Sequence, residues 1–137
     1  MNWKRFLWAA LVVFVVTKGL DYLIDTFILM PDYKKLAILR PDVTSTAGLM
    51  FVVGALVAFM FTYIFVKVRK GKGIREGVRF GIMIWLFADL PTGLGAWMLF
   101  PVPITPIVKW ILNGLLLSLI GGILAAAIYR PAGQAKT

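Results

Sequence analysis

The sequence predicts an all-α membrane protein, an antiparallel bundle of four transmembrane helices with its N- and C-termini in the cytoplasm. Three observations predict this fold: the composition, four long apolar stretches, and the distribution of lysine and arginine. Of the 137 residues, 61% are hydrophobic and 15% are charged, and the mean hydropathy is +0.88. Soluble domains carry about 45–50% apolar and about 25% charged residues. The composition therefore excludes a soluble globular domain, because a chain this short leaves much of its surface exposed.

Four stretches are long and apolar enough to cross a bilayer, which takes about 20 predominantly apolar residues. They cover approximately residues 6–30, 46–66, 78–100 and 107–129. Together they form a single transmembrane domain, residues 1–137, with no room for a separate soluble domain. They do not alternate polar and apolar residues, so a β-barrel does not fit. Lys4 and Arg5 resemble the start of a signal peptide, but no small-residue cleavage site follows, and we expect the first helix to be retained.

Lysine and arginine gather on one side of these stretches. Ten of the fifteen basic residues lie at the termini or between the second and third stretches: Lys4, Arg5, Lys67, Arg69, Lys70, Lys72, Arg75, Arg79, Arg130 and Lys136. The positive-inside rule places this side in the cytoplasm. The net charge of +9 is thus explained by membrane topology and by contact with anionic lipids at the inner face, and we expect no nucleic-acid partner. A site for nucleic acid or another partner is the weaker alternative.

The connections between the stretches are short. We expect the segment from Pro31 to Ser45 to form a turn that lies on the membrane surface. The prolines between Pro101 and Pro106 remove backbone donors, so the third helix must end there. The first two stretches and the last two form hairpins with a similar pattern of basic residues and proline. This similarity fits either duplication of one hairpin or the positive-inside rule acting on both.

Small residues recur at helical spacing. The candidate packing positions are Gly54 and Ala58 in the second stretch, and Gly114, Ser118, Gly122 and Ala126 in the fourth. The third stretch begins with Gly77 and Gly81. Helices in lipid associate where small residues let their backbones approach closely. This pattern favours packing inside the bundle, and the alternative is an interface with a second copy or with another membrane subunit.

Ionisable residues inside the predicted helices are the candidate functional residues, because they are costly in a bilayer. The expected polar cluster consists of Lys18, Asp21, Asp25, Asp89, Lys109 and Asn113. Lys18 can pair with Asp89, at a similar depth, or with Asp21 on its own helix face. Pro91 predicts a kink beside Asp89 that has room for a water or a ligand group. The cluster serves either to fix helix register, to handle a proton or ion through Asp89 or Asp25, or to bind a polar substrate or head group.

The residue types restrict the chemistry. The sequence contains neither cysteine nor histidine, so disulfides, thiolate metal sites and histidine ligands or bases are excluded. Ser45 and Ser118 have no base near them in the sequence. We therefore expect no metal, no cofactor and no catalytic activity.

Several motifs resemble a group of small bacterial four-span inner-membrane proteins that has no assigned activity. They are Asn2-Trp-Lys-Arg-Phe, Leu20-Asp-Tyr-Leu-Ile, Glu76-Gly-Val-Arg-Phe-Gly, Pro91, Phe100-Pro-Val-Pro, Lys109-Trp110, Gly114 and Ile128-Tyr-Arg-Pro131. The resemblance covers most of the chain and implies a bacterial inner membrane, but it implies no activity. From the residues alone, we expect a non-catalytic accessory or structural subunit of a larger membrane assembly, or a self-assembling bundle. The alternative is a small transporter or an ion or proton pathway that uses the polar cluster.

Overall fold

The computed structural model describes residues 1–37 and 41–130, and these residues form helices and no strand. In chain order the elements are α1 (Trp3–Ile24), the π-helical segment η1 (Asp25–Leu29), α2 (Met30–Leu36), α3 (Val43–Val68), α4 (Ile74–Ile84), the π-helical segment η2 (Trp85–Asp89), α5 (Leu90–Leu99) and α6 (Ile104–Ile128). Within the described residues, four helices are long and apolar enough to cross a membrane: Trp3–Leu36, Thr44–Val68, Ile74–Leu99 and Ile104–Ile128. The prediction of an all-α protein with four spans is confirmed, and the chain is a multi-pass membrane protein.

The first long helix continues beyond its predicted end. The segment from Pro31 to Leu36 is helical, although we expected a surface turn from Pro31 onward. Proline is tolerated here because it directly follows the wider turn of η1, where the regular α-helical hydrogen bonding is already interrupted. Ala37 then ends the helix in a left-handed conformation, with φ of 49°. The expected turn is thus shortened at both ends, and Ile38 and Leu39, which we expected in it, lie outside the described residues.

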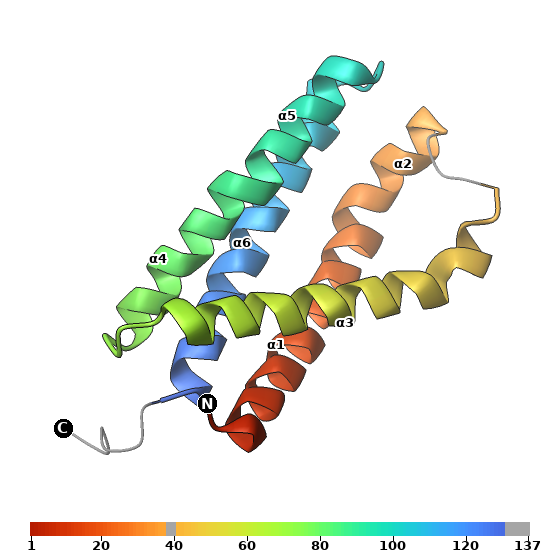
Figure 1. Cartoon of the computed structure of the whole chain (residues 1–137). Helices are drawn as coiled ribbons and strands as arrows, with labels where there is room; N and C mark the ends of the chain where they lie inside the picture. Colours follow the sequence, from red (N-terminus) through yellow and green to blue (C-terminus); the bar gives the residue numbers. More distant parts are fainter. Residues whose placement is uncertain (38–40, 131–137) are drawn as a thin grey trace.

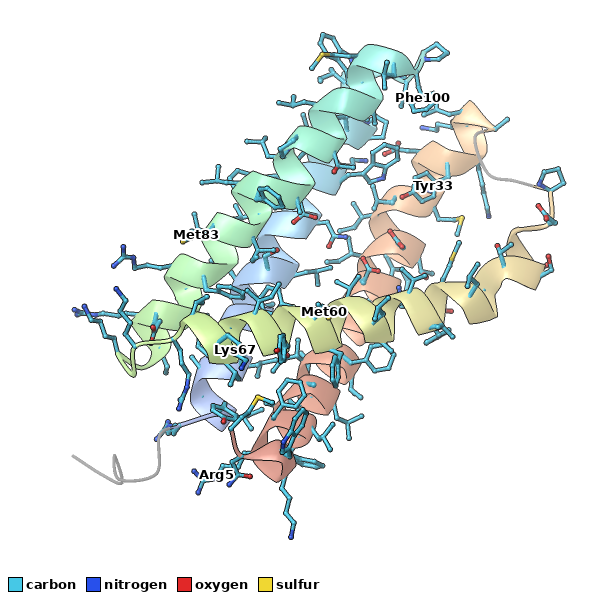
Figure 2. All side chains as sticks on the ribbon, viewed as in Figure 1. Arg5, Tyr33, Met60, Lys67, Met83 and Phe100 are labelled. Carbon is cyan, nitrogen blue, oxygen red and sulfur yellow. The ribbon has the colours of Figure 1, made fainter. Side chains whose placement is uncertain are left out.

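The four long helices alternate in direction (Figure 1). The N-terminus, the α3–α4 loop and the end of α6 lie at one end of the molecule, which we call the basic end. The α5–α6 loop and the end of α2 lie at the opposite end. Arg5 and Lys67 mark the basic end, and Tyr33 and Phe100 mark the opposite end (Figure 2). The helix formed by α4 and α5 runs along α6, whereas α3 crosses α1 obliquely and diverges from α4 and α5 (Figure 1).

Helices α4 and α6 are in backbone contact through glycines. A Cβ atom on Gly77 would overlap the carbonyl group of Gly122, and a Cβ atom on Gly122 would overlap that of Gly77. One turn further along, a Cβ atom on Gly81 would lie 2.8 Å from the carbonyl carbon of Ser118. Ala126 is also buried at this contact. The small residues of α6 are thus used within the chain, as close approach in lipid requires.

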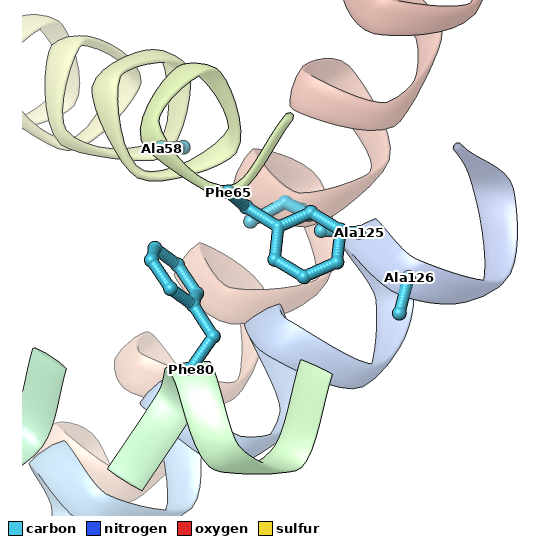
Figure 3. Close-up of a cluster of buried hydrophobic side chains, with 6 residues drawn as sticks. Ala58, Phe65, Phe80, Ala125 and Ala126 are labelled. Carbon is cyan, nitrogen blue, oxygen red and sulfur yellow. The ribbon is translucent and has the colours of Figure 1, made fainter. Parts of the chain in front are cut away.

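Figure 3 shows the main cluster of buried side chains, several of which come from the ends of the helices at the basic end. It joins α1, α3, α4 and α6 through Val13, Ala58, Phe65, Phe80, Ala125 and Ala126. The rings of Phe65 and Phe80 meet at a centroid distance of 5.3 Å and an angle of 62°, an edge-to-face geometry that aromatic pairs favour. This cluster fixes where α3 crosses the other helices.

Polar contacts tie together both ends of the molecule. At the basic end, the Tyr129 hydroxyl accepts a hydrogen bond from the backbone N–H of Asn2 at 2.9 Å. The Arg69 guanidinium donates a hydrogen bond to the Tyr129 carbonyl at 2.6 Å. It also lies 4.4 Å from the centre of the Tyr129 ring. At the opposite end, the indole N–H of Trp110 donates to the Tyr33 hydroxyl at 2.7 Å, which joins α2 to α6.

Candidate functional site

Each of the two π-helical segments contains an aspartate and precedes a proline. Met30 donates its backbone N–H to the carbonyl of Asp25, and Leu90 donates to that of Trp85, in each case five residues back. The following residues, Pro31 and Pro91, have no N–H with which to continue an α-helical pattern. Proline and π-turns both distort helices, and π-turns are frequent at functional sites. A π-helical turn thus precedes Pro91, where a kink was predicted, and a matching π-helical turn precedes Pro31 in the first helix.

A cleft of about 730 Å³ lies between α1, η1, α3, η2 and α6. The outer part of α3 forms one wall with apolar side chains: Leu49, Met50, Val53 and Val57. The polar lining of the cleft comes from several helices: Thr17, Lys18, Asp21, Asp25, Thr46, Asp89 and Ser118. The cleft thus combines a mainly apolar wall with charged side chains within the membrane-spanning part of the chain.

Lys18 pairs with Asp21, which settles the choice between its two possible partners. The Lys18 ammonium lies 3.2 Å from the Asp21 carboxylate, and their side chains are 27% and 25% exposed. The Asn113 amide of α6 donates to the other oxygen of Asp21 at 3.0 Å. Asp21 therefore links α1 to α6. The aliphatic part of Lys18 covers Gly54, where a Cβ atom would lie 3.3 Å from the lysine Cδ.

Asp89 reaches across to α6 from η2. Its carboxylate accepts a hydrogen bond from the Ser118 hydroxyl at 3.3 Å. A Cβ atom on Gly114 would lie 2.6 Å from the carboxyl carbon of Asp89, so the absence of a side chain at Gly114 makes room for this carboxylate. Gly114 and Ser118, expected only as packing residues, also position a charged group.

Asp25 lines the cleft from η1. Among the described residues, its carboxylate has no hydrogen bond and no ion pair. Asp89 likewise has no cationic partner within the described part of the chain. Of the charges that line the cleft, the Lys18–Asp21 pair is neutral overall, and two carboxylates remain.

Lys109 does not join the other members of the expected cluster. Its ammonium lies 2.6 Å from the carboxylate of Asp32, at the opposite end of the molecule. The sequence did not indicate this pair, because Asp32 was expected in a surface turn rather than in a continuation of the first helix. The six expected residues thus divide into a Lys18–Asp21–Asn113 group, the Lys109–Asp32 pair, and the two cleft carboxylates of Asp25 and Asp89.

The arrangement can hold positive charge inside the membrane. A carboxylate that lacks a cationic partner in surroundings of low dielectric gains free energy by binding a proton or a cation. The described residues contain no group of three or more histidine, cysteine, aspartate or glutamate side chains placed to hold a metal ion. Comparisons with protein-family models, curated proteins and solved structures gave no match to this chain.

Proposed function

We propose that this integral membrane protein is a small transporter, or an ion or proton pathway, that holds its charged substrate in the cleft. The observation that carries the proposal is the position of Asp25 and Asp89. They come from different long helices and line the same cleft, and neither forms an ion pair among the described residues, although Lys18 attracts Asp25 at longer range. Ionisable groups at such positions are functional candidates by default.

The free energy of ionisation supports this proposal. Removing an ion from water costs several kcal/mol even in relaxed protein surroundings, unless an opposite charge compensates it. The Lys18 charge is already compensated by Asp21 at 3.2 Å. Asp25 and Asp89 therefore favour a second positive charge in the cleft, either as a proton on a carboxylate or as a bound cation.

The role of an accessory subunit, which the sequence favoured, is a second proposal. One observation favours it: the outer part of α3 is exposed all round its circumference, with Leu49 to Val53 at half exposure or more. The case for self-assembly is weaker, because Ser118, Gly122 and Ala126 pack against α4 of the same chain. For either role, we place the protein in a bacterial inner membrane, with the basic end in the cytoplasm against anionic lipids.

Flux in reconstituted liposomes tests the transport proposal. Wild-type protein is compared with Asp25→Asn, Asp89→Asn and the double variant, under an imposed pH gradient and under gradients of Na⁺ or K⁺. Asp42→Asn is the matched control, because Asp42 precedes α3 and does not line the cleft. We expect flux above that of empty liposomes, lost in the double variant and retained in the control. Flux that is absent in the wild type, or equal in the double variant, contradicts the proposal. Co-purification of other polypeptides in fixed ratio would instead support the accessory role.

A further inference from the structure

The cleft is far larger than a proton or a single metal ion requires. We propose that its substrate is an amphipathic organic amine in its protonated form, an inference that rests on the transport function proposed above. The ammonium group would bind the carboxylates of Asp25 and Asp89, and the apolar body would lie against α3.

Volume is the first argument for this substrate class. Small-molecule pockets typically enclose about 300–1,000 Å³, and the cleft volume of about 730 Å³ falls within that range. A proton or a metal ion would occupy only the carboxylates and would leave the apolar wall without a role. An organic cation uses both.

The second argument is the distribution of polar and apolar groups. The wall on α3 presents Leu49, Met50 and Val53, and the aromatic rings of Phe14 and Phe61 also line the cleft. Methionine adapts to irregular apolar shapes, and aromatic faces attract ammonium groups. The carboxylates of Asp25 and Asp89 line the same cleft from η1 and η2. The lining is therefore itself amphipathic, with a net negative charge.

The third argument is charge and hydrogen-bonding capacity. An alkylammonium group carries up to three N–H donors, and an ionised carboxylate only accepts. The Asp89 carboxylate accepts a hydrogen bond from the Ser118 hydroxyl, and the Asp25 carboxylate accepts none from the side chains of the described residues. Charge-assisted hydrogen bonds to such carboxylates are about twice as strong as neutral ones. The two carboxylates match a diamine in charge, and they match a monoamine when one of them is protonated.

Depth distinguishes a free amine from the amine of a lipid head group. Asp89 lies near the middle of the span Ile74–Leu99, and its partner Ser118 lies near the middle of Ile104–Ile128. At about 1.5 Å per residue, each lies roughly 15–23 Å from the ends of its helix. A lipid head group would have to leave the interface by that distance, whereas a free amphipathic amine partitions into the bilayer and enters from the side.

Binding of dansylcadaverine, a fluorescent aromatic amine, tests this inference. The titration uses the full chain in nanodiscs of phosphatidylcholine, with empty nanodiscs as background. The N-acetylated form of the same probe has the same body without the charge. We expect saturable binding of the amine, binding of the acetylated form that is about 10- to 100-fold weaker, and a similar loss of amine affinity in the Asp25→Asn/Asp89→Asn variant.

A matched pair of valine variants tests the location and the size argument. Val53 lines the cleft, and its neighbour Val52 on the same helix does not. Val53→Trp should therefore reduce amine affinity about 10-fold or more, because the indole fills the space of the amine's body, whereas Val52→Trp should not.

The outcomes separate this inference from the function on which it rests. Proton or metal-ion flux that depends on Asp25 and Asp89, without saturable amine binding, overturns the amine and leaves the transport function standing. Absence of both flux and binding overturns both. Equal binding of the acetylated probe, or equal effects of Val52→Trp and Val53→Trp, also overturns the inference. Loss of amine binding in nanodiscs containing phosphatidylethanolamine would assign the cleft to the lipid head group instead.

Discussion

Replacing Gly122 by alanine should force α4 and α6 apart. The added Cβ atom would overlap the carbonyl oxygen of Gly77 and would lie 2.9 Å from the carbonyl carbon of Gly77. It would also lie 3.3 Å from the backbone nitrogen of Gly81. Non-bonded carbon atoms prefer separations of about 3.5–4.0 Å. All three neighbouring atoms belong to backbone, so no side-chain rotation can relieve the overlap, and the helices themselves must move.

The magnitude follows from the cost of overpacking. Inserting a methyl group into a well-packed interior typically costs about 1–3 kcal/mol, and backbone contacts that cannot relax belong at the upper end of that range. We therefore expect Gly122→Ala to lower the free energy of unfolding by about 3 kcal/mol. Gly77→Ala inserts a methyl group into the same contact from the other side. The double variant should cost less than the sum of the two, because the helices have already separated.

The assay is thermal unfolding in detergent, followed by the fluorescence of the tryptophan residues. Gly19→Ala is the matched control, because nothing lies within 4 Å of a Cβ atom at Gly19, which is also inside a helix. Alanine is favoured over glycine in a helix by roughly 0.5–1 kcal/mol, so this control should not be destabilised. An unfolding midpoint of Gly122→Ala equal to that of the wild type would refute the close contact between α4 and α6.

Three further predictions concern the charged residues and the positions that hold them in place. Gly114→Ala should push the Asp89 carboxylate from its place, because the new Cβ atom would lie 2.6 Å from the carboxyl carbon of Asp89. Flux in liposomes should therefore fall beyond what any loss of folded protein accounts for. A lower unfolding midpoint with unchanged flux contradicts this prediction. Lys18→Met should lower the free energy of unfolding by about 1–3 kcal/mol, because Asp21 loses its cation. Adding Asp21→Asn should recover part of that loss, as measured by thermal unfolding. No recovery would argue against the Lys18–Asp21 ion pair. Pro91→Ala restores a backbone N–H after η2, so hydrogen exchange should detect a protected amide at position 91, and flux should decrease. An unprotected amide at position 91 would contradict the idea that the missing N–H of Pro91 causes the π-helical turn of η2.

The four spans follow from the sequence because the bilayer leaves few alternatives. Backbone groups in lipid must be satisfied within each segment, so a long apolar stretch becomes a helix. Its ends are less determined. The sequence predicts that Pro31 ends the first helix, but the π-helical turn of η1 accommodates the missing N–H of this proline, and the helix continues to Leu36.

The polar site was predictable only in part. The Lys18–Asp21 pair depends on spacing within one helix, so the sequence could indicate it. The pairing of Lys109 with Asp32 depends on how far the first helix extends. The position of Asp89 beside Gly114 and Ser118 depends on a glycine contact between helices, and the cleft depends on the crossing direction of α3. Neither relation is encoded in the periodicity of a single stretch.

The oblique crossing of α3 makes the cleft sensitive to the tilt of one helix. Helix α3 is held at Ala58 and Phe65 by the buried cluster, and Thr46 lies on the far side of the cleft from that contact. At about 1.5 Å per residue, the segment from Ala58 to Thr46 is a lever arm of about 18 Å. A change of about 5° in tilt moves Thr46 by about 1.6 Å, a simple consequence of that length. Because bilayer thickness influences helix tilt, a thinner or thicker membrane changes the width of the cleft without altering any residue that lines it.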